Sequence, residues 1–106
     1  MSGIKHSFAQ LMLEINNEVF IERMQQNEKW GVQRHPMGRW LAILVEEVGE
    51  VAEAMQDGMV SQKSTDANNL YKELIQVGAV ASAMAEQVKE EQEAQQQKPP
   101  YADLDD

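Results

Sequence analysis

The segment that most constrains the fold is residues 40–55, WLAILVEEVGEVAEAM, which reads as a single amphipathic helix. At about 100° per residue, its large apolar side chains fall on one stripe. A helix of this kind buries its stripe against other elements, so the segment predicts a protein built from packed helices. The expected stripe consists of Leu41, Leu44, Val48, Val51 and Met55.

The same helix carries a concentration of acidic side chains. Glu46, Glu50 and Glu53 fall nearly opposite the apolar stripe, and Glu47 lies at its border. Like charges three or four residues apart destabilise a helix by about a few tenths of a kcal/mol per pair, and residues 40–55 contain no Lys or Arg. A hard divalent cation would relieve this repulsion. The alternative is an ordinary solvated face.

Composition limits the classes of function. The 106 residues predict one domain, and the net charge of −9 argues against binding to nucleic acid polymers or anionic membranes. The chain has no cysteine, which excludes disulfides and thiol chemistry. Its longest strongly apolar run, residues 40–45, is far shorter than the roughly 18 residues of a membrane span. We therefore expect a soluble, cytoplasmic protein.

Two further helices are expected, at residues 4–28 and 67–90. The first has apolar residues at spacings of three and four and reads as a core helix. Within the second, VGAVASAMA at residues 77–85 is apolar or small on nearly every side, so we expect burial on more than one side. Self-association is one way to achieve this burial, and it predicts a homo-oligomer. The stripe expected on the second helix is Leu70, Leu74, Val77, Ala81, Met84 and Val88.

Between the first two helices, residues 29–39 read as a loop that is rich in cations and flanked by the only two tryptophans. Flat aromatic rings and cations together suit a ligand that has phosphates and a base. The alternative is that the tryptophans anchor the loop to the core and the cations offset nearby glutamates. The candidate substrate-binding residues are Lys29, Trp30, Arg34, His35, Arg39 and Trp40.

A second group of polar residues borders the apolar face of the third helix. Asn69, Glu73 and Gln76 share one edge at spacings of four and three, which repeats the geometry of Glu47 and Glu50. Two helices that present such borders to each other would build an oxygen-rich site between them.

A polar connector is expected at residues 58–66, with Gly58 ending the acidic helix and Ser64, Thr65 or Asp66 capping the next. Residues 1–90 are expected to form the domain. Residues 91–106 predict a frayed helix end followed by a disordered acidic tail, or else a segment that docks on a neighbouring subunit.

EEVGEVAEAM, the connector and NLYKELIQVGAV together resemble the MazG-like nucleotide pyrophosphohydrolases of the all-α NTP pyrophosphatase superfamily. The family pattern is ExxE followed, after a gap, by ExxD. Glu47 and Glu50 match ExxE, Glu73 matches the first position of ExxD, and Gln76 stands where the family has Asp. The resemblance covers about residues 22–90, and QNEKWGVQRHP is also similar to a stretch in some MazG-like proteins.

The resemblance implies a compact helical bundle that assembles as a dimer or tetramer. It implies Mg²⁺, with Mn²⁺ able to substitute, held by Glu47, Glu50 and Glu73, and Gln76 would add a neutral oxygen. The implied reaction converts a nucleoside triphosphate into the monophosphate and pyrophosphate, in a nucleotide-clearing role. Glu46 or Glu50 is the candidate catalytic base. Asn69 joins the loop residues as a substrate-binding candidate.

Gln76 also keeps a second hypothesis open, because an amide brings no charge to a metal. A MazG-like module with weakened catalysis would bind a nucleotide or metal for regulation. A third hypothesis is a structural helical assembly whose glutamates are only a solvated surface.

Overall fold

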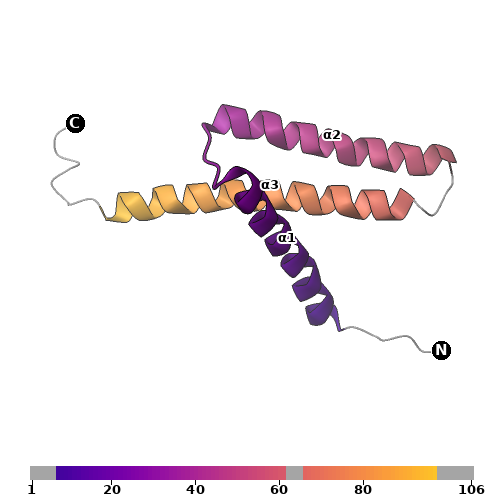
Figure 1. Ribbon diagram of the computed structural model, residues 1–106, viewed down its shortest axis with the longest axis horizontal. Coiled ribbons are helices and arrows are strands. Elements are labelled where there is room, and N and C mark those ends of the chain that lie inside the picture. Colours follow the sequence, from indigo (N-terminus) through magenta and orange to yellow (C-terminus); the bar gives the residue numbers. More distant parts are fainter. Residues whose placement is uncertain (1–6, 62–65, 98–106) are drawn as a thin grey trace.

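The computed structural model of the chain describes residues 7–61 and 66–97, and the regular secondary structure of these residues is entirely helical. The helices are α1 (Phe8–Trp30), α2 (Met37–Ser61) and α3 (Asp66–Gln96). Figure 1 shows α2 and α3 side by side as an antiparallel hairpin, with α1 crossing α3 at a steep angle. The expected all-α fold is therefore confirmed.

Local sequence signals explain both ends of α1. Ser7 caps its start, where the Ser7 hydroxyl accepts a hydrogen bond from the Gln10 backbone N–H and the Gln10 side chain accepts one from the Ser7 N–H. Gly31 ends the helix with φ of 79°, a conformation that glycine adopts without strain. The expected loop is accordingly shorter than residues 29–39 and comprises residues 31–36.

α2 and α3 both end later in the sequence than expected, and α2 begins earlier, at Met37 rather than Trp40. α2 continues through Gly58 to Ser61, and α3 continues to Gln96 rather than ending near residue 90. Isolated glycine is tolerated in a helix at a cost of about 1 kcal/mol, so Gly58 alone does not stop α2. The candidate caps Ser64 and Thr65 lie outside the described residues, as does the expected acidic tail at 98–106.

The core lies between α2 and α3. Its central cluster is Trp40, Val80 and Ala83, and Ile43, Leu44 and Met84 pack against that cluster. Trp40 is only 3% exposed. Further along the hairpin the buried residues are Val51, Ala54, Ile75 and Ala79.

The stripes expected on α2 and α3 are partly wrong. On α2, Leu44 and Val51 face the core, but Leu41, Val48 and Met55 are exposed. The inward face of α2 is rotated toward Trp40, Ile43, Glu47 and Ala54 because apolar residues surround more than half of this helix. On α3 the corresponding change exposes Leu74, Ala81 and Val88, and it buries Ile75, Ala79, Val80, Ala83 and Gln87.

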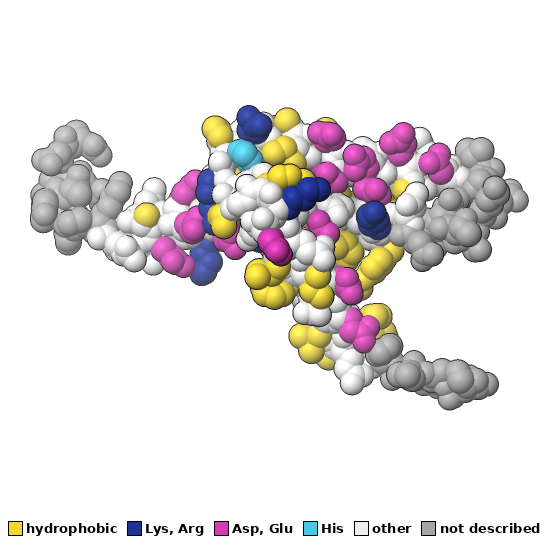
Figure 2. All heavy atoms as spheres, viewed as in Figure 1, with side chains coloured by type: hydrophobic (Ala, Val, Ile, Leu, Met, Phe, Trp, Pro, Cys, Tyr) yellow, Lys and Arg dark blue, Asp and Glu magenta, His cyan; other side chains and the backbone are white. Residues whose placement is uncertain are grey.

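The expectation that α1 is an ordinary core helix is also wrong within one chain. Its N-terminal half projects beyond the hairpin (Figure 1), and hydrophobic side chains gather on the projecting part (Figure 2). Phe8 is 88% exposed, and Met12 and Leu13 are exposed by about two thirds. The contact of α1 with the rest of the chain is made by its C-terminal half, against α3.

α3 is packed from two sides, as its apolar segment at residues 77–85 predicts. α2 lies along one side of α3 and α1 crosses another, whereas α1 and α2 do not pack closely on each other. At the crossing a Cβ on Gly78 would lie 3.1 Å from Val19 Cγ2, so glycine permits the close approach. The burial of residues 77–85 therefore does not itself require a second subunit.

None of the three helices, over the residues that the structure describes, is long and apolar enough to cross a membrane. Figure 2 shows acidic side chains spread over the C-terminal half of α2, which agrees with the charge pattern of the sequence.

Candidate metal centre and adjoining cavity

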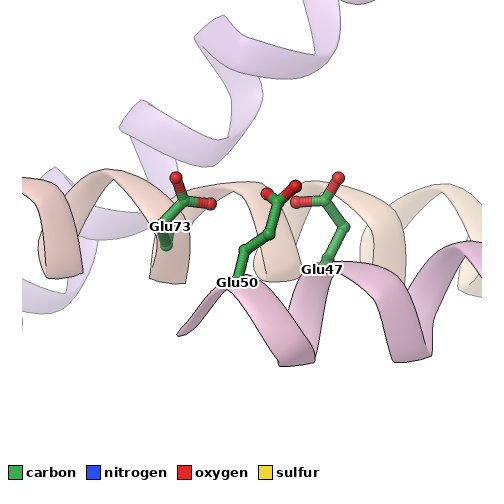
Figure 3. A group of neighbouring side chains, drawn as sticks. All are labelled: Glu47, Glu50 and Glu73. Carbon is green, nitrogen blue, oxygen red and sulfur yellow. The ribbon is translucent and has the colours of Figure 1, made fainter. Parts of the chain in front are cut away.

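Three glutamates come together where α2 and α3 lie side by side. Glu47 and Glu50 are one turn apart on α2, and Glu73 faces them from α3. One carboxylate oxygen from each lies within 4.8 Å of the other two. Figure 3 shows the three carboxylates directed to the same side of the hairpin. The facing of two acidic helix borders, predicted from spacing, is therefore present in the fold.

The electrostatic environment opposes ionisation of two of these carboxyls. Burial raises the pKa of Glu47, and the charges of Glu50, Glu73 and Glu46 add to the rise. Burial also raises the pKa of Glu73, with contributions from a hydrogen bond and the charge of Glu50, while Lys72 partly opposes the rise. Each of these groups would be stabilised by a proton or by a cation.

One oxygen of each of these two groups also lacks a hydrogen-bond partner. Glu47 Oε2 and Glu73 Oε2 are buried and have no hydrogen-bond partner. A buried polar atom without a partner costs about 1–3 kcal/mol, and more when it is charged. Three carboxylates around one point form the donor set that hard divalent cations prefer, so a Mg²⁺-sized ion fits the chemistry of these residues.

A cavity of about 170 Å³ adjoins the carboxylates. It lies among the three helices because α1 and α2 both pack on α3 without closing on each other. Glu47 and Gln76 contribute to its wall and connect it to the acidic cluster. The other lining residues are Arg23, Gln26, Asn27, Trp30, Gly31, Gln33, Trp40, Ile43, Val80 and Ala83.

Gln76 and Asn69 are placed differently from the three glutamates. The side-chain oxygen of Gln76 accepts a hydrogen bond of 3.2 Å from Gln26 Nε2, and the same amide donates to Glu22 at 2.8 Å. Gln76 therefore lines the cavity, and its oxygen already accepts one hydrogen bond from α1. Asn69 is exposed on the first turns of α3 and does not line this cavity.

Of the two candidate bases, only Glu50 belongs to the cluster. Glu46 is exposed and lies outside the group of three, although its charge contributes to the raised pKa of Glu47. Glu50 is also exposed, so its carboxylate is open to solvent while one of its oxygens joins the cluster.

The three cations of residues 29–39, which are Lys29, Arg34 and Arg39, do not line the cavity. Arg34 donates hydrogen bonds to Glu90 at 2.6 Å and to Glu86 at 2.8 Å, and the hydrogen bond to Glu90 is the largest cause of its raised pKa. In this conformation α3 holds the guanidinium of Arg34, so the expected contact of Arg34 with a phosphate stays a prediction and would require these ion pairs to be exchanged. Lys29 Nζ lies 4.8 Å above the Trp30 ring, and Arg39 is exposed.

Both tryptophans line the cavity, but in different ways. Trp30 is 59% exposed, which leaves part of its ring free. Trp40 is buried, and its indole N–H donates a hydrogen bond of 2.7 Å to Gln87. The His35 ring packs edge-on against Trp40 with 4.8 Å between ring centres. Trp40 and His35 thus anchor the loop, which was the alternative interpretation of these residues.

One cation and several amides that line the cavity were not predicted from the sequence. Arg23 is 9% exposed, lines the cavity, and donates hydrogen bonds of 2.9 Å to Ser82 and Glu86. The available signal was its position: Arg23 follows Val19 by four residues, where the pattern of α1 calls for an apolar side chain. Gln26 and Asn27 gave no comparable signal.

Comparison of the chain with protein-family models, with curated proteins and with solved structures finds no match. The resemblance to MazG-like proteins accordingly rests on the motif residues Glu47, Glu50 and Glu73, and the geometry of the cluster and cavity is the structural basis for a function.

Proposed function

We propose that this protein is a Mg²⁺-dependent nucleoside triphosphate pyrophosphohydrolase that produces the monophosphate and pyrophosphate. The observation that carries the proposal is the pair of buried, unpartnered oxygens on Glu47 and Glu73, which converge with Glu50 beside a cavity. A solvated acidic surface would leave no such atoms buried. The arrangement therefore favours a bound cation over the purely structural hypothesis.

Glu47, Glu50 and Glu73 would hold the ion, and Mn²⁺ would be accepted by the same oxygen donors. When bound, the ion supplies neutralisation of the charge that develops on the leaving pyrophosphate. The remaining chemistry belongs to the chain. The carboxylate of Glu50 is the best-placed proton acceptor, because it is both part of the cluster and open to solvent.

In the proposed reaction a water oxygen bonds to the α-phosphorus as the bond to the bridging oxygen breaks. The proton of that water passes to Glu50. The cavity would receive the base, with the exposed ring of Trp30 as a stacking surface and the amides of Gln26 and Asn27 as hydrogen-bonding groups. Arg23 is the proposed phosphate-binding cation because it lines this cavity, and it would contact the phosphate in addition to its hydrogen bonds to Ser82 and Glu86.

A regulatory binding module is the second candidate function, and Gln76 favours it. The oxygen of Gln76 accepts a hydrogen bond from Gln26, so the position where the family has a charged ligand adds no charge, and its neutral oxygen is already hydrogen-bonded in this conformation. Weaker metal binding would leave a nucleotide-binding protein with slow or absent turnover.

We also propose self-association as a dimer or tetramer. Apolar residues that are exposed in the single chain occur on the projecting half of α1 and along α2, where Leu41, Val45 and Val48 are each about half exposed or more. Contiguous exposed apolar residues of this kind mark association surfaces. We propose that the enzyme acts in the cytoplasm on free nucleotides. Its net charge of −9 argues against binding to nucleic acid polymers or anionic membranes.

Product analysis tests the proposal. The protein is incubated with a panel of ribo- and deoxyribonucleoside triphosphates, with Mg²⁺, with Mn²⁺ or with chelator, and products are identified by anion-exchange chromatography. We expect monophosphate and pyrophosphate in equal amounts, only with metal, and loss of both in Glu47→Ala and Glu73→Ala. Glu46→Ala is the matched control, because Glu46 is an exposed glutamate of the same helix outside the cluster.

Two outcomes would contradict the enzyme proposal. Turnover that survives both alanine substitutions would show that the cluster is not the site. No turnover of any nucleotide, combined with a nucleotide-dependent rise in melting temperature, would instead support the binding module.

A further inference from the structure

Gln87 is a buried side chain of α3 with a complete set of hydrogen bonds. Its oxygen accepts from the His35 backbone N–H at 3.0 Å and from the Trp40 indole N–H at 2.7 Å. Its nitrogen donates to the His35 carbonyl at 2.7 Å and to Glu91 at 3.3 Å. Only 9% of Gln87 is exposed, so water does not replace these bonds easily.

The pattern of bonds requires an amide. His35 presents both its N–H and its C=O to Gln87, and the side chain answers with an acceptor and a donor, as another peptide group would. Glutamate would keep the acceptor but place a second oxygen against the His35 carbonyl. An apolar side chain would leave the His35 groups and the Trp40 N–H unpaired.

Through these bonds Gln87 fixes two parts of the cavity wall. Trp40 is itself a wall residue. The loop at residues 31–36 contains His35, and two other residues of this loop, Gly31 and Gln33, also line the cavity. Arg34 also ties this loop to α3 through ion pairs, and its side chain is more exposed than Gln87. The hydrogen bonds of Gln87 to His35 and Trp40 join neutral groups, and the bond to the Trp40 indole is buried, so we infer that they set the position of the Trp40 ring.

We propose that Gln87 is a positioning residue that sets the shape of the cavity and hence the affinity for the nucleotide base. This inference rests on the proposed function. Gln87 is not among the residues that line the cavity, so it acts through Trp40 and His35 rather than by touching the ligand. Neither Trp40 nor His35 belongs to the carboxylate cluster, so metal binding should not depend on Gln87.

The test compares Gln87→Met with Gln92→Met, a substitution of an exposed glutamine on the same helix. For Gln87→Met we expect KM for the preferred nucleotide to rise at least tenfold, while kcat and Mn²⁺ affinity stay within about threefold of the wild-type values. For Gln92→Met we expect no change. If Gln87→Met fails to fold, Gln87→Glu, which keeps the size and the acceptor, is measured in its place with the same expectation for KM.

Nuclear magnetic resonance tests directly whether Gln87 holds the Trp40 side chain in place. The chain has two tryptophans, so a ¹⁵N spectrum contains two indole N–H signals. The Trp40 signal should be protected from solvent exchange in the wild type and should lose protection in Gln87→Met, whereas the Trp30 signal should not change.

The outcomes separate this inference from the proposed function. Unchanged KM in the folded Gln87 variant of an active protein would overturn the role of Gln87 alone. A fall in kcat or Mn²⁺ affinity as large as the change in KM would show a general structural defect and also overturn it. A wild-type protein that neither hydrolyses nor binds any nucleotide would overturn the proposed function and this inference together.

Discussion

Replacing Glu47 by glutamine removes one charge from the acidic cluster with little change in shape. Each of the three carboxylates has an oxygen within 4.8 Å of the others. Two unit charges at that separation repel by about 3.5 kcal/mol at an effective dielectric constant near 20, and by about 0.9 kcal/mol in bulk water. Glu50 is exposed and therefore partly screened. We expect Glu47→Gln to increase the free energy of unfolding of the metal-free protein by about 1–3 kcal/mol at neutral pH.

The pH dependence has a definite sign. Folding raises the pKa of Glu47 and Glu73, so the folded state binds their protons more tightly than the unfolded state does. The metal-free wild type is therefore relatively most stable below the unfolded pKa of about 4.3, and it loses stability as pH rises through the folded-state pKa values. Glu47→Gln should lose less stability over this interval. Saturating Mg²⁺ should reverse the order of the two proteins, because only the wild type retains all three ligands.

Thermal unfolding followed by circular dichroism measures both effects. A change of 1 kcal/mol corresponds to roughly 4–8 °C in Tm for a domain of this size. Glu46→Gln is the control: it relieves only a surface repulsion of about a few tenths of a kcal/mol, and it should keep the full response to Mg²⁺. Charge repulsion within the cluster is refuted if Glu47→Gln destabilises the metal-free protein at neutral pH. Equal stabilisation of Glu47→Gln and the wild type by Mg²⁺ would refute the role of Glu47 as a metal ligand.

Three other predictions, which cover four substitutions, have defined outcomes. Gly49→Ala should stabilise the protein by about 0.5–1 kcal/mol in urea unfolding, because nothing lies within 4 Å of the added Cβ; Gly78→Ala should gain less, because its Cβ would meet Val19 at 3.1 Å, and equal gains would contradict this packing. Arginine hydrogen bonds lower the pKa of Glu86, so its stabilising effect is present above about pH 4.3 and is lost as pH falls through the lowered pKa. Glu86→Gln should therefore flatten the loss of Tm between pH 5 and pH 2, and an unchanged acid limb would count against the ion pairs. Ser7→Ala should weaken the first turn of α1 by about 1 kcal/mol, seen as faster amide hydrogen exchange there with little change in Tm; unchanged exchange would show that the capping box contributes nothing.

The acidic cluster was accessible from sequence because helical spacing is local. Spacings of three place Glu47 and Glu50 on one side of a helix, and the position of Glu73 beside an apolar face indicates which way it points. Gln76 shows where this reasoning stops. Gln76 follows Glu73 by three residues, as Glu50 follows Glu47, but its oxygen accepts a hydrogen bond from Gln26, a residue 50 positions away. No local pattern reports such a partner.

It was harder to predict which face of each helix points to the core, because α2 and α3 carry more apolar surface than one neighbouring helix can cover. On α2 both Leu41 and Ile43 are candidates for the core, and periodicity does not decide between them. The orientation is decided by the packing of Trp40 against α3 and by its bond to Gln87. The ion pairs of Arg34 could not be predicted for a similar reason, since its partners Glu86 and Glu90 are more than 50 residues away.

The way α1 joins the fold divides the molecule into two parts with different cooperativity. All three cluster carboxylates belong to the α2–α3 hairpin, whereas the cavity wall requires the C-terminal half of α1. A transient detachment of α1 would therefore open the cavity while the ion-binding carboxylates remained assembled. Ligands that occupy the cavity would favour the attached state, so the exchange protection of α1 should rise with nucleotide and respond little to metal alone.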